Sequence, residues 1–154
     1  MRNMKTLTSV VALIIVAVLG GRESGLFDQA TAVAPSISGS AVAEANDDLR
    51  TAFQNRVSDL QITGSGRVAK VLADDNKGSR HQRFLLRTDS GQTVLVAHNI
   101  DLASRIDGLQ VGDEVEFNGE YEWNEKGGVI HWTHRDPRGR HEAGWLRHMG
   151  RTYD

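Results

Sequence analysis

The feature that most constrains the fold is a strictly alternating segment at 114–123, which a glycine-containing turn separates from 128–134. Odd positions of the first segment are apolar or glycine, and even positions are acidic or amide. This period of two predicts a strand that buries one face and exposes the other. The turn at 124–127 predicts a hairpin in which 128–134 is the returning strand.

The register across this hairpin predicts which side chains face one another. It pairs Glu120 with His131 on the polar face and Gly119 with Trp132 on the apolar face. We therefore expect Trp132 in the core, in the space that the glycine leaves. His131 and His134 are separated by an odd number of positions, so a regular strand directs them to opposite faces. A metal site shared by these two histidines is disfavoured on this ground.

Three further strands are predicted before this hairpin, at 60–72, 81–88 and 93–98. Gly64 and Gly66 in the first of them indicate a bend of the kind found at barrel corners. The spacing of apolar residues at 100–106 predicts a short helix between the third and fourth strands. Another helix is predicted before the first strand, where residues 46–48 offer capping side chains and apolar residues follow at helical spacing.

A three-stranded meander, a short helix and a two-stranded hairpin thus follow one another along the chain. This is the order of an OB-fold, a five-stranded, partly open Greek-key barrel. We therefore predict a mainly β domain: a five-stranded, OB-fold-like small barrel with a short N-terminal helix and one short helix between strands 3 and 4. The alternative is an open antiparallel sheet with the N-terminal helix on one face.

The first 21 residues have the form of an export signal. Arg2 and Lys5 precede an apolar run at 7–19, and a basic segment followed by an apolar core is typical of a secretory signal peptide. The run is shorter than the roughly 20 apolar residues of a comfortable membrane span. The alternative is an uncleaved membrane anchor at 7–21. Both interpretations predict an exported, periplasmic protein, and an uncleaved segment would be its only contact with the membrane.

The composition of the remaining chain limits its domain boundaries and the kinds of site that it can form. Residues 22–45 are rich in Ser, Ala and Gly and are interpreted as a flexible linker, which leaves 46–154 as the folded domain. The chain has no cysteine, which excludes disulfides and thiolate metal sites, so any metal site must use histidines and carboxylates. The formal net charge of −2 gives no general attraction to nucleic acid. No cofactor is expected.

The C-terminal segment 135–154 differs from the rest of the chain. It contains five arginines against three acidic residues, together with aromatic side chains. A local basic and aromatic surface suits a polyanionic ligand, with rings available for stacking. The residues expected to bind such a ligand are His131, His134, Arg135, Arg138, Arg140, His141 and Trp145. The alternative is a segment that wraps the barrel, with Trp145 and Leu146 covering one open end and the arginines paired with the acidic strand.

Five short motifs lie between residues 66 and 134, within a resemblance that covers roughly residues 64–153 of the chain. They are GxV at 66–68, HQxF at 81–84, AHNIDL at 97–102, VGDxVxFxGxYxW at 111–123 and GGVIHWTH at 127–134. In this combination the chain resembles a small exported bacterial family known only as a domain of unknown function (DUF 3465). The resemblance implies an exported bacterial protein. It implies no activity, substrate or catalytic residue.

Three functions remain open from the sequence. The favoured one is a non-enzymatic binding module for a polyanionic or oligomeric ligand, such as a nucleic acid or a glycan. The second is a metal-dependent hydrolase or nuclease that uses His131, His134, Asp136 and His141, with the last three as metal ligands. Their spacing matches no established metal motif. The third is an envelope module that binds a protein partner.

Overall fold

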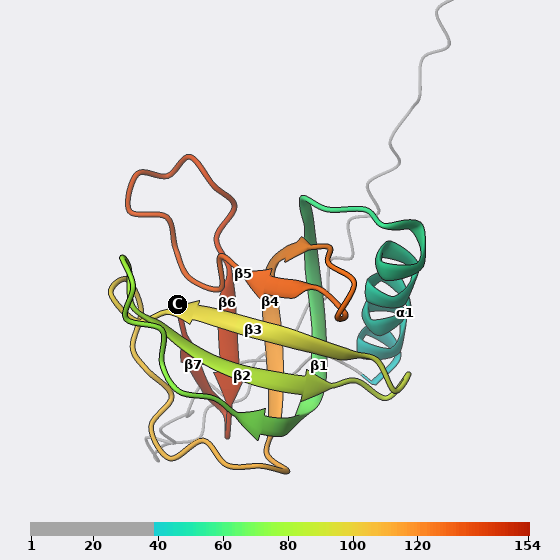
Figure 1. The fold of residues 1–154 in the computed structure, drawn as a ribbon, viewed down its shortest axis with the longest axis horizontal. Coiled ribbons are helices and arrows are strands. Elements are labelled where there is room, and N and C mark those ends of the chain that lie inside the picture. The colour runs from blue at the N-terminus through green and yellow to red at the C-terminus, as the bar shows by residue number, and fades with distance from the viewer. Residues whose placement is uncertain (1–38) are drawn as a thin grey trace, which may run out of the picture. The chain divides into compact units, whose positions relative to one another are not determined.

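The computed structural model of the protein describes residues 39–154, which form one helix and seven strands (Figure 1). In chain order these are α1 (Gly39–Asn55), β1 (Leu60–Val71), β2 (His81–Arg87), β3 (Thr93–Asn99), β4 (Glu114–Glu122), β5 (Val129–His131), β6 (Trp145–His148) and β7 (Arg151–Tyr153). The export signal or anchor expected at 1–21, and the linker before residue 39, lie outside the described residues. No helix in the described part of the chain is long and apolar enough to cross a membrane.

Five of the strands close into a barrel, as the sequence predicted. They lie in the order β1, β2, β3, β5 and β4, and β1 pairs again with β4 to complete the ring. The long β1 serves both neighbours, because residues 60–67 pair with β4 and residues 67–71 pair with β2. β3 and β5 run parallel, whereas the other pairs in the ring are antiparallel. The arrangement is that of an OB-fold-like barrel.

The bend predicted for β1 combines a close approach with a break in register. A Cβ atom on Gly64 would lie 2.8 Å from the ring of Phe117, so the missing side chain lets β1 pass over this ring. The register of β1 against β2 shifts between Val68 and Lys70. An irregularity of this kind bends a strand and increases its twist. Together these features let one strand contribute to both ends of the barrel.

The core is built from the inward positions of the alternating strands. Every second residue of β2, β3 and β4 is buried, and α1 packs on β1 and contributes Leu49 and Ala52. The largest fully buried apolar side chains are Tyr121, Phe84, Phe117, Leu49, Leu86, Ile106, Ile130 and Leu146. Because the inward positions are filled in this way, the outward positions of the same strands are left for contacts with solvent or a ligand.

The helix α1 begins at Gly39, earlier than the capping residues predicted at 46–48. The described end of the predicted linker, residues 39–45, is therefore helical. Asn46 is buried within the helix, and its Oδ1 accepts a hydrogen bond from the backbone N–H of Ser65 at 3.3 Å. The polar side chain that looked like a cap instead joins α1 to β1.

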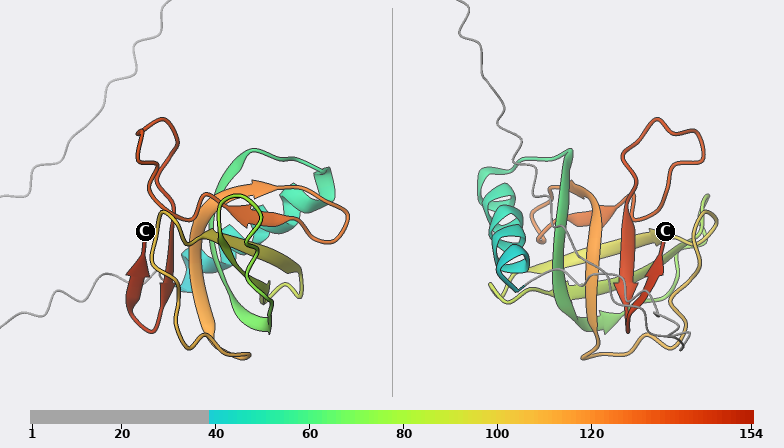
Figure 2. Two further views of the ribbon diagram at one scale, coloured as in Figure 1. Left: turned by 60° about the vertical axis from the view of Figure 1, so that its left-hand side comes forward. Right: turned by 180° about the vertical axis from the view of Figure 1, so that it is seen from behind.

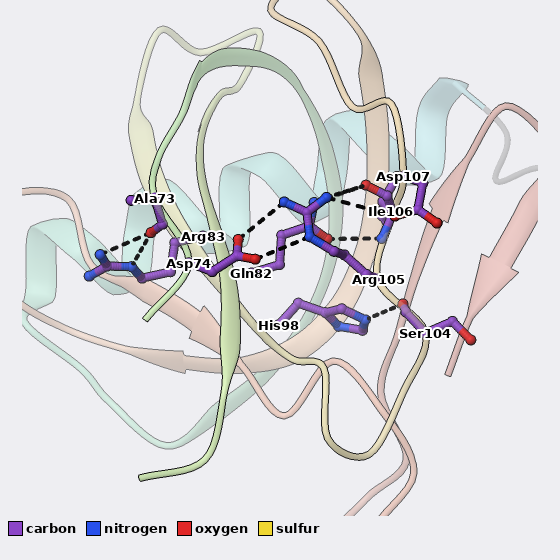
Figure 3. Close-up of polar contacts among 9 residues, drawn as sticks. All are labelled: Ala73, Asp74, Gln82, Arg83, His98, Ser104, Arg105, Ile106 and Asp107. Atoms are coloured by element: carbon purple, nitrogen blue, oxygen red, sulfur yellow. Dashed lines mark hydrogen bonds and ion pairs between the residues drawn. The ribbon is translucent and has the colours of Figure 1, made fainter. Parts of the chain in front are cut away.

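The helix predicted between strands 3 and 4 is not formed, and residues 100–109 form turns and irregular segments. The side chain of Gln82 donates to the carbonyl of Ile106 and accepts from its N–H, both at 2.9 Å (Figure 3). Arg105 donates two hydrogen bonds to Asp74, at 3.1 and 3.2 Å. Because a side chain of β2 satisfies these backbone groups, the segment does not need the internal hydrogen bonds of a helix.

The last two strands were not predicted. β6 pairs with residues 115–118 of β4, and β7 forms a hairpin with β6 (Figure 2). Leu146 is fully buried, and Arg147 forms an ion pair with Glu116 at 3.1 Å. The alternative in which the C-terminal segment covers the barrel and pairs with its acidic strand is thus closer to the structure, and the segment does so as added strands.

The predicted hairpin register holds as far as His131 and then fails. Glu120 pairs with His131, as expected. β5 ends there, and Trp132 adopts a left-handed backbone conformation with φ of 52°. The prediction that Trp132 fills the core opposite Gly119 is therefore wrong. Its side chain lines the surface and is only partly buried, and Gly119 instead gives room to the backbone carbonyl of His131.

Replacing Gly119 with alanine should destabilise the barrel. The new Cβ would lie 2.5 Å from the carbonyl oxygen of His131 and 2.8 Å from the side chain of Ile130. Both belong to β5, which strand pairing holds against β4. We expect the free energy of unfolding to fall by about 1–3 kcal/mol, measured by urea denaturation.

The control for this prediction is Gly39→Ala, because nothing lies within 4 Å of the Cβ position there. This variant should retain the stability of the parent protein. Equal stability of Gly119→Ala and the parent would contradict the close approach of β4 and β5.

Candidate functional site

Three adjoining shallow hollows lie on the outward face of the barrel and form what we call the outer groove. The first, about 450 Å³ in volume, lies over β2, β3 and β5. It shares His81, Ala97 and His131 with the second hollow. The second shares Leu102 and Trp132 with the third, which also includes Asp136, Pro137, Arg138 and Arg140. The outer groove thus runs from the sheet to the loop between β5 and β6, which projects from the barrel in Figures 1 and 2.

Strand alternation explains which residues face the outer groove. Leu95 of β3 and Val129 of β5 are register neighbours and give the first hollow its aliphatic floor. In the next row Arg83 lies opposite Ala97. Figure 3 shows the guanidinium of Arg83 donating to the carbonyl of Ala73, which follows β1. The groove residues on β2 were not among the predicted site residues. The same alternation that identified the strand also marks them as outward-facing.

His131 and two glutamates of β4 gather at one edge of the outer groove. The Nε2 atom of His131 lies 3.3 Å from Oε1 of Glu120 and 3.6 Å from Oε2 of Glu122. The sequence register predicted the neighbour Glu120, but it missed Glu122, which belongs to the next outward position on the strand. Within residues 39–154, these three form the one group of histidine and acidic side chains whose possible metal-ligand atoms lie within 4.8 Å of one another.

The loop 132–144 brings His141 to the second oxygen of Glu120. The Nε2 atom of His141 lies 2.6 Å from Oε2 of Glu120, and its Nδ1 lies 2.8 Å from the carbonyl oxygen of Glu142. An ionised carboxylate and a carbonyl can only accept, so both ring nitrogens carry protons. Burial disfavours the charged ring, but the hydrogen bonds and the charge of Glu120 outweigh it, and the pKa of His141 is raised above its ordinary value.

The ring of Trp132 lies between the groove and this imidazolium. It stacks on His141 with ring centres 4.2 Å apart and planes inclined by 6°. The ring of His134 lies 5.3 Å away and is tilted, while its Nδ1 donates to the carbonyl of Arg135 at 2.8 Å. A cation on the face of an indole is favourable, so these contacts fix the start of the loop.

Asp136 organises the tip of the loop. Its carboxylate accepts hydrogen bonds from the backbone N–H groups of Arg138, Arg140 and His141. These bonds, together with the positive charge of Arg140, lower the pKa of Asp136 below its ordinary value. The carboxylate of Asp136 is therefore occupied by hydrogen bonds from the backbone of its own loop. It does not bring His134, Asp136 and His141 together around one point, as a shared metal site would require.

The predicted ligand-binding residues separate into groups. Arg135 forms an ion pair with Asp154 at 2.6 Å. Arg138 and Arg140 line the outer groove, and neither forms an ion pair with a carboxylate among residues 39–154. Trp145 lies on β6 and is not among the residues that line the three hollows. The predicted residues that line the outer groove are His131, His134, Arg138 and Arg140.

His98 is fully buried and joins three segments of the barrel. Its Nε2 donates to the carbonyl of Ser104 at 3.1 Å (Figure 3), so its Nδ1 accepts from the hydroxyl of Thr133 at 2.8 Å. Burial lowers the pKa of His98 to about 4, and the nearby His134 and His81 add to this effect. The ring is therefore neutral near pH 7 and holds β3, the turns after it and the start of the loop 132–144.

The family described as "Protein of unknown function (DUF3465)" matches residues 32–154, a range that includes every helix and strand described above. The chain belongs to this family. The match agrees with the resemblance carried by the sequence motifs, and the DUF3465 domain of this protein is the OB-fold-like barrel with its two added strands. No curated protein matches the sequence.

Because His98 is buried in its neutral form, the stability of the domain should fall as the pH drops. Between the ordinary pKa of 6.5 and the folded value of about 4, the unfolded chain binds a proton that the folded chain does not. The contribution of His98 is fully present above pH 6.5 and is lost progressively down to pH 4. It amounts to about 3 kcal/mol.

Urea denaturation at several pH values checks this prediction. Over this interval the unfolding free energy of His98→Gln should depend less steeply on pH than that of the parent. An unchanged pH dependence in this variant would show that other groups cause the acid sensitivity.

Proposed function

We propose that this DUF3465 protein is a non-catalytic binding module whose outer groove takes an extended anionic oligomer. The observation that carries the proposal is the composition of one continuous groove: an aliphatic floor, an indole wall, and two arginines that form no ion pair within the described residues. Repeating anionic groups, as in single-stranded nucleic acid or an acidic glycan, have the matching chemistry.

The shape of the outer groove supports an extended ligand over a compact one. Its three hollows are shallow, and each shares lining residues with the next. A small molecule would fill one hollow and leave the others exposed, whereas a chain of several units spans them. OB-fold barrels often present a sheet face and its adjoining loops to such oligomers. This last point is an analogy of fold, so the residues of the groove carry the argument.

The distribution of charge supports an anionic ligand. Three of the four glutamates on the outward face of β4 have a basic partner, in the pairs Glu114–Arg67, Glu116–Arg147 and Glu120–His141. These basic partners offset part of the negative charge of β4, so the strand repels an approaching anion less than unpaired glutamates would. Arg138 and Arg140 at the other end of the groove have no such carboxylate partner in the described structure, so their charge is available to a ligand.

A hydrolase that uses His134, Asp136 and His141 has weaker support, because each of these side chains is already bonded to its own loop or to Glu120. The apolar run at 7–19 supports a periplasmic location for the binding module. An anionic glycan or nucleic acid outside the cytoplasm is therefore the class of ligand that we propose.

Removal of the guanidinium groups of Arg138 and Arg140 should weaken binding. We expect Arg138→Gln combined with Arg140→Gln to lower the affinity roughly tenfold, since each exposed contact contributes on the order of 0.5–1 kcal/mol. The slope of log affinity against log salt should fall by about one for each arginine removed. Fluorescence anisotropy with a labelled single-stranded oligonucleotide and with a labelled sulfated glycan, at several salt concentrations, measures both quantities.

The matched control is Arg50→Gln, which removes an exposed arginine from α1, away from the groove lining. It should bind like the parent protein. Binding to only one of the two ligands identifies the class. The proposal is wrong if neither ligand binds at low salt, or if Arg50→Gln weakens binding as much as the groove variant.

A further inference from the structure

Three possible metal-ligand atoms converge where β4 pairs with β5. They are the Nε2 atom of His131, Oε1 of Glu120 and Oε2 of Glu122. All three side chains leave the same outward face of two paired strands, since Glu120 pairs with His131 and Glu122 with the residue two positions before it. Paired strands hold such groups more rigidly than loops do. The backbone thus fixes one imidazole and two carboxylates around one point.

The distances among these atoms resemble those within a coordination sphere. The Nε2 atom of His131 lies 3.3 Å from one carboxylate oxygen and 3.6 Å from the other. Two ligands that bind a tetrahedral zinc ion at about 2.0–2.1 Å lie roughly 3.4 Å from each other. A direct N–H···O bond to a carboxylate is shorter, at about 2.7–2.9 Å. The spacing therefore suits an ion between the groups better than a hydrogen bond between them.

A second observation is independent of the cluster's composition. The Nε2 atom of His131 is buried, yet it makes no hydrogen bond to any group within residues 39–154. A buried ring nitrogen without a partner costs free energy. Its position between two carboxylates is the position of a metal ligand, and an ion there would satisfy it. We propose that Glu120, Glu122 and His131 bind one divalent transition-metal ion, and that Zn²⁺ is the ion that fits best.

The chemistry of the ligands selects the ion. Imidazole favours Zn²⁺ and similar metals over Mg²⁺ and Ca²⁺, which prefer oxygen ligands. Two carboxylates balance the charge of a divalent ion. Three protein ligands also leave one position of a tetrahedral ion open to solvent or to an anionic group. Glu122 is about half exposed, at 52%, so an ion can enter from the surface.

His141 acts as a positioning residue for this site. It holds the second oxygen of Glu120 at 2.6 Å, and so orients the first oxygen toward His131. Hydrogen bonds of this kind orient metal ligands in many proteins. This ligand set differs from the set His134, Asp136 and His141 considered from the sequence. It also stands independently of the proposed oligomer binding, because Arg138 and Arg140 take no part in it.

Metal titration of the full chain, purified without a histidine tag and treated with a chelator, tests the proposal. Isothermal titration calorimetry with Zn²⁺ should show one ion for each chain. His131→Gln and Glu122→Gln should each lower the affinity at least about tenfold. Co²⁺ should give the visible absorption of a tetrahedral site in the parent protein, and this absorption should be lost in His131→Gln.

The control is His81→Gln, which removes another half-buried histidine of the outer groove and should keep the parent affinity and spectrum. Circular dichroism checks folding. If His131→Gln does not fold, Glu122→Gln decides the question, because its exposed side chain bears little on stability. The proposal is overturned if the parent binds no Zn²⁺, if Glu122→Gln binds it unchanged, or if His81→Gln loses it equally. The three residues would then form only a cross-strand ion pair.

Discussion

The outer groove depends on the backbone conformation of Trp132, where the chain leaves the sheet. Up to His131 the chain pairs with β4, and at Trp132 a positive φ of 52° turns it away. Farther along β4, β6 takes the place that a longer β5 would have occupied, with Asn118 paired to Trp145. The loop 132–144 thus connects β5 and β6, which both pair with β4. It places an indole, two arginines and His141 beside the sheet.

The two ends of the loop 132–144 are in direct contact. The backbone N–H of Gly144 donates to the carbonyl of His134 at 3.0 Å. A Cβ on Gly144 would collide with the carbonyl oxygen of Trp132. The end of the loop can therefore lie against its start only because residue 144 has no side chain. His98, through Thr133, ties the same point to β3. The positive φ of Trp132 is therefore stabilised by contacts of its neighbours with Gly144 and with His98.

The sequence was a good guide wherever one face of a strand is buried. The sequence pattern predicted five barrel strands and the pairing of Glu120 with His131, because burial of one face imposes a period of two. It failed where side chains replace backbone pairing. Gln82 holds Ile106 in an irregular segment whose apolar spacing resembles that of a helix. Spacing along the chain carries no information on such a distant partner.

The candidate site was predictable only in part for the same reason. His131 and Glu120 are neighbours through strand register, which the sequence reveals. The approach of His141 to Glu120 depends on the path of a loop that Asp136 fixes through backbone hydrogen bonds. β6 escaped prediction because its four residues are too few for a pattern and one of its two buried positions is His148, although Leu146 is buried and Arg147 pairs across the strands.

The hairpin of β6 and β7 gives this barrel something that a closed ring lacks, an open strand edge. In the described residues β7 has a neighbour on one side only, and its unpaired backbone groups could template pairing with another chain. Two features oppose this. The strand has three residues, and its exposed Arg151 stacks its guanidinium on the ring of Tyr153, 5.0 Å from the ring centre. Short length and positive charge are the means by which proteins protect such edges from aggregation.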